Sequence, residues 1–236
     1  MEFTCERIII NKTPIIIQKE HLDRYYYVRE FVKNKKVLDI ACGSGYGSEI
    51  IVNYGCKSYL GIDISNETVI EANKHYKSRK VKFLCGDGTD LHFVKNNMFD
   101  VIVSYETIEH IQNYKKFIKE LKRVLNREGV LIISTPNKKY SSPNSIKPIN
   151  PYHVIEFYPD EYKLLLNKYF SNVDLKGQDL QSKIKSIKKI IVNLFPKKFR
   201  QSIIPIKIRN SYNLNQVSKI NDKPYNSRFL IAICKK

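Results

Sequence analysis

Three glycines at alternate positions, Gly43, Gly45 and Gly47, directly follow the apolar run Val37–Ile40. A glycine-rich turn that leads from a strand into a helix brings backbone N–H groups and a helix N-terminus close to a ligand, as in nucleotide sites. Alone, the spacing G-x-G-x-G is equally that of a tight turn that binds nothing. The chemistry therefore has to be argued from the residues that accompany it.

Acidic residues accompany the glycines along the chain. Asp63 ends an apolar run about 20 residues past the glycines, where a carboxylate can accept both ribose hydroxyl protons. Asp87 ends the next apolar run and could accept a hydrogen bond from an adenine amino group. Asp39 lies inside an apolar run, where an unpaired carboxylate is costly and an ammonium-bearing ligand would explain it. The pattern indicates a nucleoside that carries an amino group.

A second group of polar residues, Glu106, Glu109 and His110, follows the apolar run Val101–Ser104. Ligands of open parallel sheets bind at this end of the strands. A histidine that titrates near neutrality can take a proton from a hydroxyl, and a divalent metal can lower the pKa of that hydroxyl. The segment therefore predicts a site that activates an oxygen nucleophile.

Alternating apolar and amphipathic runs must position these residues. We expect strands at Val37–Ile40, Ser58–Ile62, Val81–Cys85, Val101–Ser104, Val130–Ser134, Val173–Leu175 and Phe229–Ile233, and helices at Gln18–Lys33, Gly45–Tyr54, Asn66–Ser78 (capped by Ser65), Tyr114–Leu125 and Asp160–Tyr169. Short strands separated by crossover-length helices specify right-handed parallel β-α-β units. We therefore predict a single α/β domain over 1–236, a Rossmann-like, doubly wound, mostly parallel sheet of seven strands. Its core would span about 34–175 plus the final strand 228–234.

The segment 180–227 differs from the rest, and we interpret it as a basic, partly helical insertion before the last strand. The chain has a formal net charge of +18, and within 180–228 there are twelve Lys or Arg residues and a single acid, Asp222. An amphipathic cationic stretch over 183–209 could lie on an anionic membrane or cover the mouth of the site. We see no secretion signal and no apolar stretch of roughly 20 residues, so we expect a cytoplasmic protein, with peripheral membrane contact as an option.

The ordered motifs resemble those of class I S-adenosylmethionine-dependent methyltransferases. The resemblance rests on Val37–Gly47, Gly61–Ile64, Gly86-Asp87, Phe99–Val103 and Gly129–Asn137, in that order, and extends over roughly 37–170. One departure is Ala41, where such enzymes commonly have glycine. The resemblance implies S-adenosylmethionine as the cofactor, with the following binding residues: Arg24, Asp39, Ala41, Gly43, Gly45, Asp63, Ile64, Asp87, Gly88 and Ser104. In it, Arg24 would pair with the cofactor carboxylate.

The spacing E-x-x-E-H resembles two groups within that fold. One is the small-RNA 3′-terminal 2′-O-methyltransferases, and the other is the ubiquinone-biosynthesis O-methyltransferases, which belong with the type 11 group. By this resemblance Glu106, Glu109 and His110 are catalytic, and with His153 they would hold Mg²⁺ or Mn²⁺. The alternative is that Glu109 caps a helix and His110 lines the pocket without a metal.

The acceptor is predicted from resemblance alone. The pattern Thr135-Pro136-Asn137 followed by Asn150–His153 is most similar to bacterial methyltransferases associated with surface polysaccharides, which implies a hydroxyl on a sugar or glycan precursor. The alternatives are a metal-dependent RNA 2′-O-methyltransferase and a small-molecule enzyme for quinone- or catechol-type acceptors. Nucleic acid is the weaker partner, because the basic residues alternate with aliphatic rather than stacking aromatic ones. Oligomeric state is left open.

Overall fold

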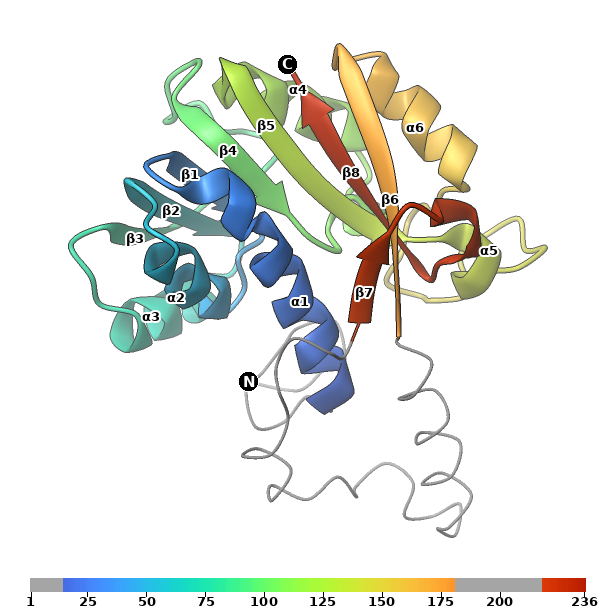
Figure 1. Ribbon diagram of the computed structural model, residues 1–236, viewed down its shortest axis with the longest axis horizontal. Coiled ribbons are helices and arrows are strands. Elements are labelled where there is room, and N and C mark those ends of the chain that lie inside the picture. The colour runs from blue at the N-terminus through green and yellow to red at the C-terminus, as the bar shows by residue number, and fades with distance from the viewer. Residues whose placement is uncertain (1–14, 181–217) are drawn as a thin grey trace, which may run out of the picture.

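A central sheet organises the computed structural model of the chain, which describes residues 15–180 and 218–236 (Figure 1). Within these ranges eight strands form one sheet in the order β3-β2-β1-β4-β5-β8-β6-β7. The strands are β1 Lys36–Ile40, β2 Ser58–Asp63, β3 Val81–Cys85, β4 Phe99–Ser104, β5 Leu125–Pro136, β6 Asn172–Leu180, β7 Ser218–Asn221 and β8 Phe229–Lys235. The helices are α1 Ile15–Val32, α2 Tyr46–Asn53, α3 Asn66–His75, α4 Tyr114–Val124, α5 Lys138–Ser141 and α6 Pro159–Asn167, with 3₁₀ turns η1 Ile108–His110 and η5 Pro224–Asn226.

The first five strands in the chain are parallel, so their C-terminal ends meet along one edge of the sheet. Strand β8 runs antiparallel to both β5 and β6, and β7 is antiparallel to β6. The start of β8 therefore lies at the same edge as the end of β5, where Phe229 pairs with Pro136. All the loops that carry predicted site residues follow strands at this edge.

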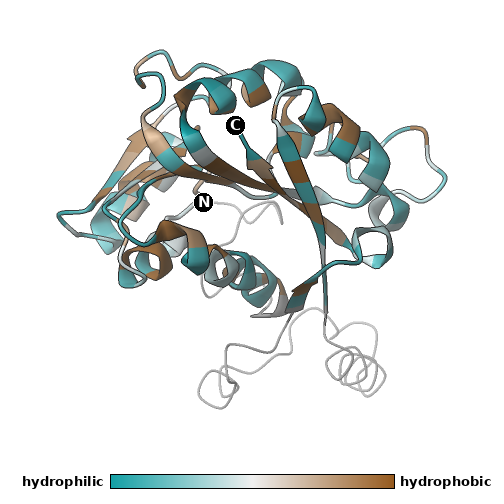
Figure 2. Cartoon of the chain, turned by 45° about the horizontal axis from the view of Figure 1, so that its top comes forward, coloured by the Kyte–Doolittle hydropathy of each residue, from teal (hydrophilic) through white to brown (hydrophobic). Residues whose placement is uncertain are grey.

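Helices cover both faces of the sheet, and the apolar strand residues lie between the two helical layers (Figure 2). One buried cluster contains residues of α4 and α6, including Phe117 and Tyr162. The other contains residues of α1, α2 and α3, including Val28, Ile51 and Ala72. The near-continuous apolar runs of β1, β4 and β5 follow from burial on both faces. None of the helices in the described part of the chain is long and apolar enough to cross a membrane.

The α/β fold class and every predicted strand and helix are confirmed, although most observed elements differ from the predicted bounds by a few residues. Ser65 accepts a hydrogen bond from the Thr68 N–H and caps α3, as predicted. The prediction of seven strands was wrong by one, because residues 218–221 of the expected insertion add β7 to the sheet edge. The rest of the expected insertion, including the predicted amphipathic stretch at 183–209, falls almost entirely outside the described residues.

Helix α1 packs against the glycine turn. The ring of Tyr25 lies edge-on to that of Tyr46, with centroids 5.4 Å apart, and the Tyr46 hydroxyl is 3.2 Å from His21 Nδ1. A Cβ on Gly47 would overlap the Tyr25 ring. The third glycine of the motif thus provides room for the N-terminal helix.

Replacement of Gly47 by alanine is expected to lower the free energy of unfolding by about 1–3 kcal/mol, because the added methyl forces Tyr25 and α1 away from the turn. Urea denaturation followed by circular dichroism measures this change. Glu49→Ala, at an exposed position of α2, the helix that contains Gly47, is the control and should shift the free energy of unfolding by no more than about 0.5 kcal/mol. Equal stability of both variants would contradict this packing.

Candidate active site at the C-terminal edge of the sheet

The turn after β1 has an unusual backbone that explains its composition. Ala41, Gly43 and Gly45 all have positive φ angles, of 60°, 55° and 81°. A non-glycine residue pays roughly 1–2 kcal/mol for this conformation, so the alanine at 41 is tolerated at some strain. Gly45 is the N-cap of α2 and offers no side-chain cap, so ligand atoms can reach the first N–H groups of the helix. Around Gly43 the space is open.

Asp63 joins the glycine turn to the start of α3. Its two carboxylate oxygens accept hydrogen bonds from the N–H groups of Gly43, at 2.9 Å, and Ser65, at 3.0 Å. The next side chain, Ile64, is 69% exposed although it is large and apolar. A carboxylate beside an exposed aliphatic surface suits a ribose whose attached base packs on Ile64.

Asp39 is buried in β1 and is held by tyrosines that the sequence did not point to. The hydroxyls of Tyr25 and Tyr59 donate to Asp39 Oδ2 at 2.9 and 2.7 Å. Burial raises the pKa of Asp39 to about 7, and the two tyrosine hydrogen bonds oppose that rise. The tyrosines provide part of the pairing that we had assigned to a ligand, and Oδ1 is left without a partner.

Arg24 on α1 is completely buried. Its Nε donates to Gln178 Oε1 at 2.7 Å, and its guanidinium carbon lies 4.6 Å from the centre of the Phe229 ring. Nη2 is 3.6 Å from Glu106 Oε1, yet neither Nη1 nor Nη2 makes a hydrogen bond. A guanidinium cannot lose its charge by deprotonation, so this arrangement calls for an anion.

The other predicted donor-site residues lie at the ends of β3 and β4. Asp87 is exposed, and its Oδ1 accepts from the Thr89 N–H at 2.7 Å. A Cβ on the neighbouring Gly88 would press on Phe117 and Ile40, so glycine is needed there for packing. Ser104, the last residue of β4, is fully buried and its hydroxyl has no partner.

Glu106 is held in a strained conformation, with a φ of 49°. Its Oε1 accepts from the Ser134 hydroxyl at 2.6 Å, and its backbone N–H donates to the same hydroxyl at 3.2 Å. The carboxylate is thereby directed at Ser134 and Arg24. It does not belong to the group of possible metal ligands described below.

Glu109 and His110 lie in η1. Glu109 is fully buried, accepts one hydrogen bond from the Thr135 hydroxyl at 3.0 Å, and has no partner for Oε1. Burial, together with the nearby Glu106, raises its pKa well above the usual value. His110 Nδ1 is 3.0 Å from the Tyr152 carbonyl, which can only accept, so Nδ1 carries the proton of the neutral ring. The lone pair is therefore on Nε2.

His153 comes to this site from the loop between α5 and α6. Its ring lies 4.9 Å from that of His110, and its Nδ1 is 2.6 Å from Glu156 Oε1. A carboxylate bonded to the far nitrogen is the usual support of a metal-binding histidine. Within the described residues, Glu109, His110 and His153 place one ligand atom each within 4.8 Å of one another. Three of the four predicted metal ligands are thus together. At present His153 Nε2 faces the Asn150 amide, 3.0 Å away.

Unpaired buried atoms mark this site. In the described part of the chain, the buried side-chain nitrogen and oxygen atoms that lack a hydrogen-bond partner are Arg24 Nη1 and Nη2, Asp39 Oδ1, Ser104 Oγ and Glu109 Oε1. Buried polar groups are nearly always paired in folded proteins. All four residues were predicted as site residues from the sequence. Their unpaired atoms are consistent with bound polar ligands.

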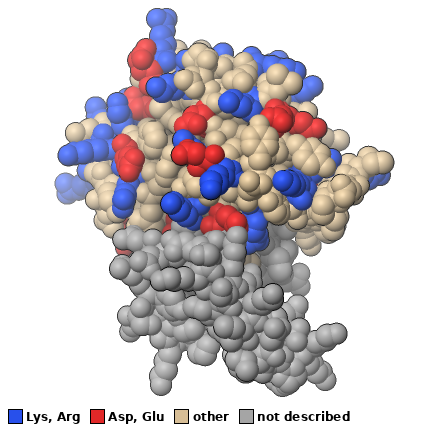
Figure 3. Space-filling view, turned by 45° about the vertical axis from the view of Figure 1, so that its right-hand side comes forward, with Lys and Arg blue, Asp and Glu red and all other residues tan. Residues whose placement is uncertain are grey.

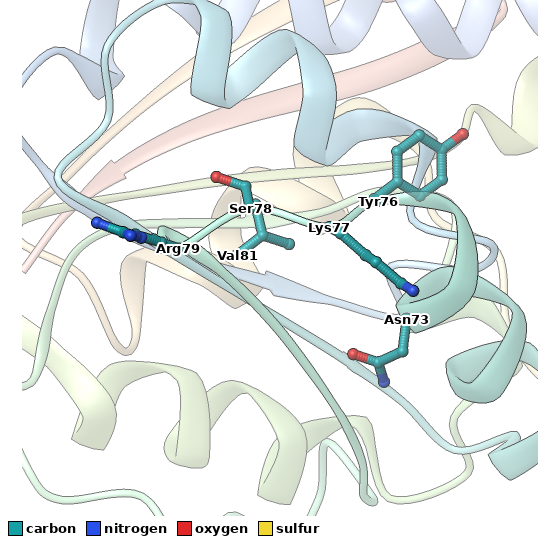
Figure 4. Close-up of a pocket in the computed structure, with 6 residues that line it drawn as sticks. All are labelled: Asn73, Tyr76, Lys77, Ser78, Arg79 and Val81. Carbon is teal, nitrogen blue, oxygen red and sulfur yellow. The ribbon is translucent and has the colours of Figure 1, made fainter.

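Sequence reasoning missed the residues that hold the predicted ones in place. These are Tyr25, Tyr59, Ser134, Gln178 and Phe229. They come from four different strands and α1, and among them only Ser134 lies within one of the motifs that carry the family resemblance. Elsewhere, a hollow lies where β3 begins (Figure 4), and it is lined by Asn73, Tyr76, Lys77, Ser78, Arg79 and Val81. It is at the opposite edge of the sheet and contains none of the predicted site residues.

Comparisons with known proteins agree with this arrangement. Residues 38–133 match the family described as "Methyltransferase domain". This stretch, about two fifths of the chain, is therefore similar to methyltransferase domains. A probable S-adenosylmethionine-dependent methyltransferase of Mycobacterium tuberculosis is 31% identical over 144 residues, covering 61% of this chain and 51% of that protein. A ubiquinone biosynthesis O-methyltransferase of Pelagibacter ubique is 34% identical, covering 56% and 57% of the two chains.

The chain spans about half the length of these curated relatives. Among solved structures, a Thermotoga maritima S-adenosylmethionine-dependent methyltransferase, described as a possible histamine N-methyltransferase, superimposes with a TM-score of 0.64 at 16% identity, covering 94% of this chain and 92% of that one. At this identity the likeness shows the fold. The family match and the curated relatives support S-adenosylmethionine as the methyl donor for the matched region.

The buried Asp39 makes a testable contribution to pH dependence. Because its folded pKa of about 7 lies above the unfolded value of about 3.9, the folded state retains a proton that the unfolded state releases between these pH values. Stability should therefore fall as pH rises across that window, by up to about 1.4 kcal/mol per unit. Asp39→Asn should remove this loss, as measured by urea unfolding at pH 5 and pH 8.

Tyr59→Phe is the matched variant. The Tyr59 hydroxyl lowers the pKa of Asp39. Its loss should therefore raise that pKa and extend the pH-dependent fall in the free energy of unfolding to higher pH. If Asp39→Asn loses as much stability between the two pH values as the unmodified chain, Asp39 does not titrate as described.

Proposed function

We propose that the chain is an S-adenosylmethionine-dependent O-methyltransferase whose donor and acceptor sites lie side by side at the C-terminal edge of the sheet. The observation that carries this proposal is the set of unpaired buried atoms on Arg24, Asp39, Ser104 and Glu109. The first two lie on α1 and β1 and carry opposite charges when both are ionised. The last lies next to His110, whose Nδ1 is 3.0 Å from the Tyr152 carbonyl. Arg24 and Asp39 suit the amino-acid group of a methyl donor, and Glu109 with His110 suits the hydroxyl of an acceptor.

The donor would bind along the glycine turn. Arg24 suits the carboxylate of the methionine part, and Asp39 Oδ1 suits its ammonium group. Asp63 and Ile64 suit the ribose and one face of the base, and the exposed Asp87 suits the adenine amino group. In this assignment Ala41, Gly43 and Gly45 contribute backbone rather than side chains, which fits the open space at Gly43.

His110 would accept the proton of the acceptor hydroxyl at Nε2 while the oxygen attacks the donor methyl group. The oxygen–carbon bond forms as the carbon–sulfur bond breaks, and the sulfonium becomes a neutral thioether. The bond from Nδ1 to the Tyr152 carbonyl would fix the tautomer and stabilise the imidazolium that results. Glu109, 3.9 Å from Nε2, would add to that stabilisation when ionised.

The residues around His110 also fit a divalent metal. Glu109, His110 and His153 would hold it, and Asn150 would give up its contact with His153. Glu106 could join as the predicted fourth ligand only by turning from Ser134. Mixed carboxylate and imidazole ligands suit Mg²⁺ or Mn²⁺. Such an ion would lower the pKa of a bound hydroxyl.

For the acceptor we propose a hydroxyl on a sugar or glycan precursor, as the resemblance around Thr135 and Asn150 implied. A second candidate is a catechol- or quinol-type acceptor. It is favoured by large apolar side chains that are at least 45% exposed in α5 and in the loop that delivers His153, namely Tyr140, Ile146, Ile149, Tyr152 and Val154. The relatives named as ubiquinone O-methyltransferases also favour it. On the face seen in Figure 3, acidic side chains lie among the basic ones, so RNA is the less favoured acceptor.

Methyl transfer from labelled S-adenosylmethionine tests the proposal directly. We expect an O-methylated product from a panel of sugar diols, catechols and RNA 3′ ends, each paired with its singly deoxygenated analogue. His110→Ala should lower kcat by about 10²–10⁴-fold with little change in donor KM. His75→Ala, at an exposed histidine of α3, should retain activity. Full activity of His110→Ala would exclude its role as the base.

Manganese binding tests the metal site separately from activity. Electron paramagnetic resonance of Mn²⁺ titrated into the chain should report bound metal, and Glu109→Gln and His153→Ala should each weaken binding at least tenfold. His92→Ala, at an exposed histidine near an exposed aspartate, is the control and should leave binding unchanged. Retention of full affinity by Glu109→Gln would contradict the metal site.

A further inference from the structure

The antiparallel strands added to the parallel sheet contribute to the environment of Arg24. Gln178 on β6 and Phe229 on β8 are paired across the two strands, so their side chains are neighbours on one face of the sheet. Phe229 is in turn paired with Pro136 at the end of β5. This face is next to α1, whose N-terminal half lies beside β7 (Figure 1). The two residues contact the guanidinium of Arg24 from this position.

Gln178 has hydrogen bonds to two groups of α1. Its Oε1 accepts from Arg24 Nε at 2.7 Å, and its Nε2 donates to the Glu20 carbonyl at 2.8 Å. The two contacts require opposite polarities, so they define the orientation of the amide. Gln178 is fully buried. The side chain therefore connects the backbone of α1 to the guanidinium and fixes the plane of that group.

The contact at Nε determines which part of the guanidinium can bind a ligand. A guanidinium can bind a carboxylate through two parallel N–H groups. With Nε engaged by Gln178 and one face covered by Phe229, the pair that is left is Nη1 and Nη2, the two atoms without a hydrogen bond. Glu106, at 3.6 Å, marks the direction of the site.

We propose that Gln178 is a positioning residue for donor binding. It orients the Nη1–Nη2 edge of Arg24 toward the α-carboxylate of the methyl donor. This deepens the proposed function, because it rests on a donor that carries an amino-acid group. No contact between Gln178 and the donor is involved, so its entire effect is transmitted through Arg24. The antiparallel strands β6 and β8 thus belong to the donor site.

Two ligands that differ only in the amino-acid group test this inference by isothermal calorimetry. S-adenosylhomocysteine has the carboxylate, whereas 5′-methylthioadenosine shares the adenosine and thioether but lacks it. Gln178→Leu should weaken S-adenosylhomocysteine binding about tenfold or more and leave 5′-methylthioadenosine within twofold. Asp174→Ala, at an exposed position of the same strand, is the control and should bind both ligands as the unmodified chain does.

A double variant tests whether the effect passes through Arg24. If it does, adding Gln178→Leu to Arg24→Met should cause no further loss of S-adenosylhomocysteine affinity. Additive losses, equal weakening of both ligands, or unchanged affinity in Gln178→Leu would each overturn the role of Gln178. Where Gln178→Leu fails to fold, Gln178→Asn serves instead, because it is too short to span both contacts and should show the same selective loss.

The outcomes also separate this inference from the proposed function. If Arg24→Met weakens both ligands equally, Arg24 does not bind the carboxylate and the inference fails, while methyl transfer can still be observed. If S-adenosylhomocysteine does not bind the unmodified chain at all, the proposed function fails first. Neither result depends on knowing the acceptor.

Discussion

A buried guanidinium that cannot lose its charge is the constraint around which much of the site is arranged. Arg24 has no exposed surface, and only one of its three nitrogens makes a hydrogen bond. An isolated charge in such a place is strongly unfavourable. The chain offsets part of this cost with an aromatic face, an amide oxygen and a carboxylate 3.6 Å away. A bound anion at Nη1 and Nη2 would offset the remaining cost. The hydrogen bonds of Gln178 to Arg24 and to the Glu20 carbonyl hold α1 in this position.

Elsewhere in the site, two acidic side chains lie close together in a buried place. Glu106 and Glu109 approach each other closely enough that Glu106 raises the pKa of Glu109, and both are supported by hydroxyls of β5. Ser134 and Thr135 are consecutive, so their side chains point to opposite faces of the sheet near its end and each meets one of the two acids. The positive φ of Glu106 is the local cost of turning it toward Ser134 and Arg24. One strand end thus separates two like charges.

The sequence predicted the elements well because their signals are local. Apolar runs, glycines and caps within a few residues of one another specify β1 to β5 and the helices between them. Most of the predicted site residues follow these strands directly, and parallel topology brings them together without further information. The supporting residues could not be predicted in this way. Gln178 is 154 positions from Arg24, and their meeting depends on the antiparallel register of β6 and β8. The eighth strand was missed because β7 is only four residues long, too short for its sequence pattern to stand out.

The same difference between local and distant contacts explains why the donor can be inferred more readily than the acceptor. The matched methyltransferase region, 38–133, contains all the predicted donor residues except Arg24. It ends before Thr135, before the loop that carries His153, and before the exposed apolar residues beside it. Apart from Thr135, which lies in β5, these later residues belong to the connection between β5 and α6. A sheet edge can therefore keep one donor site while the loop after β5 determines which hydroxyl is placed against His110.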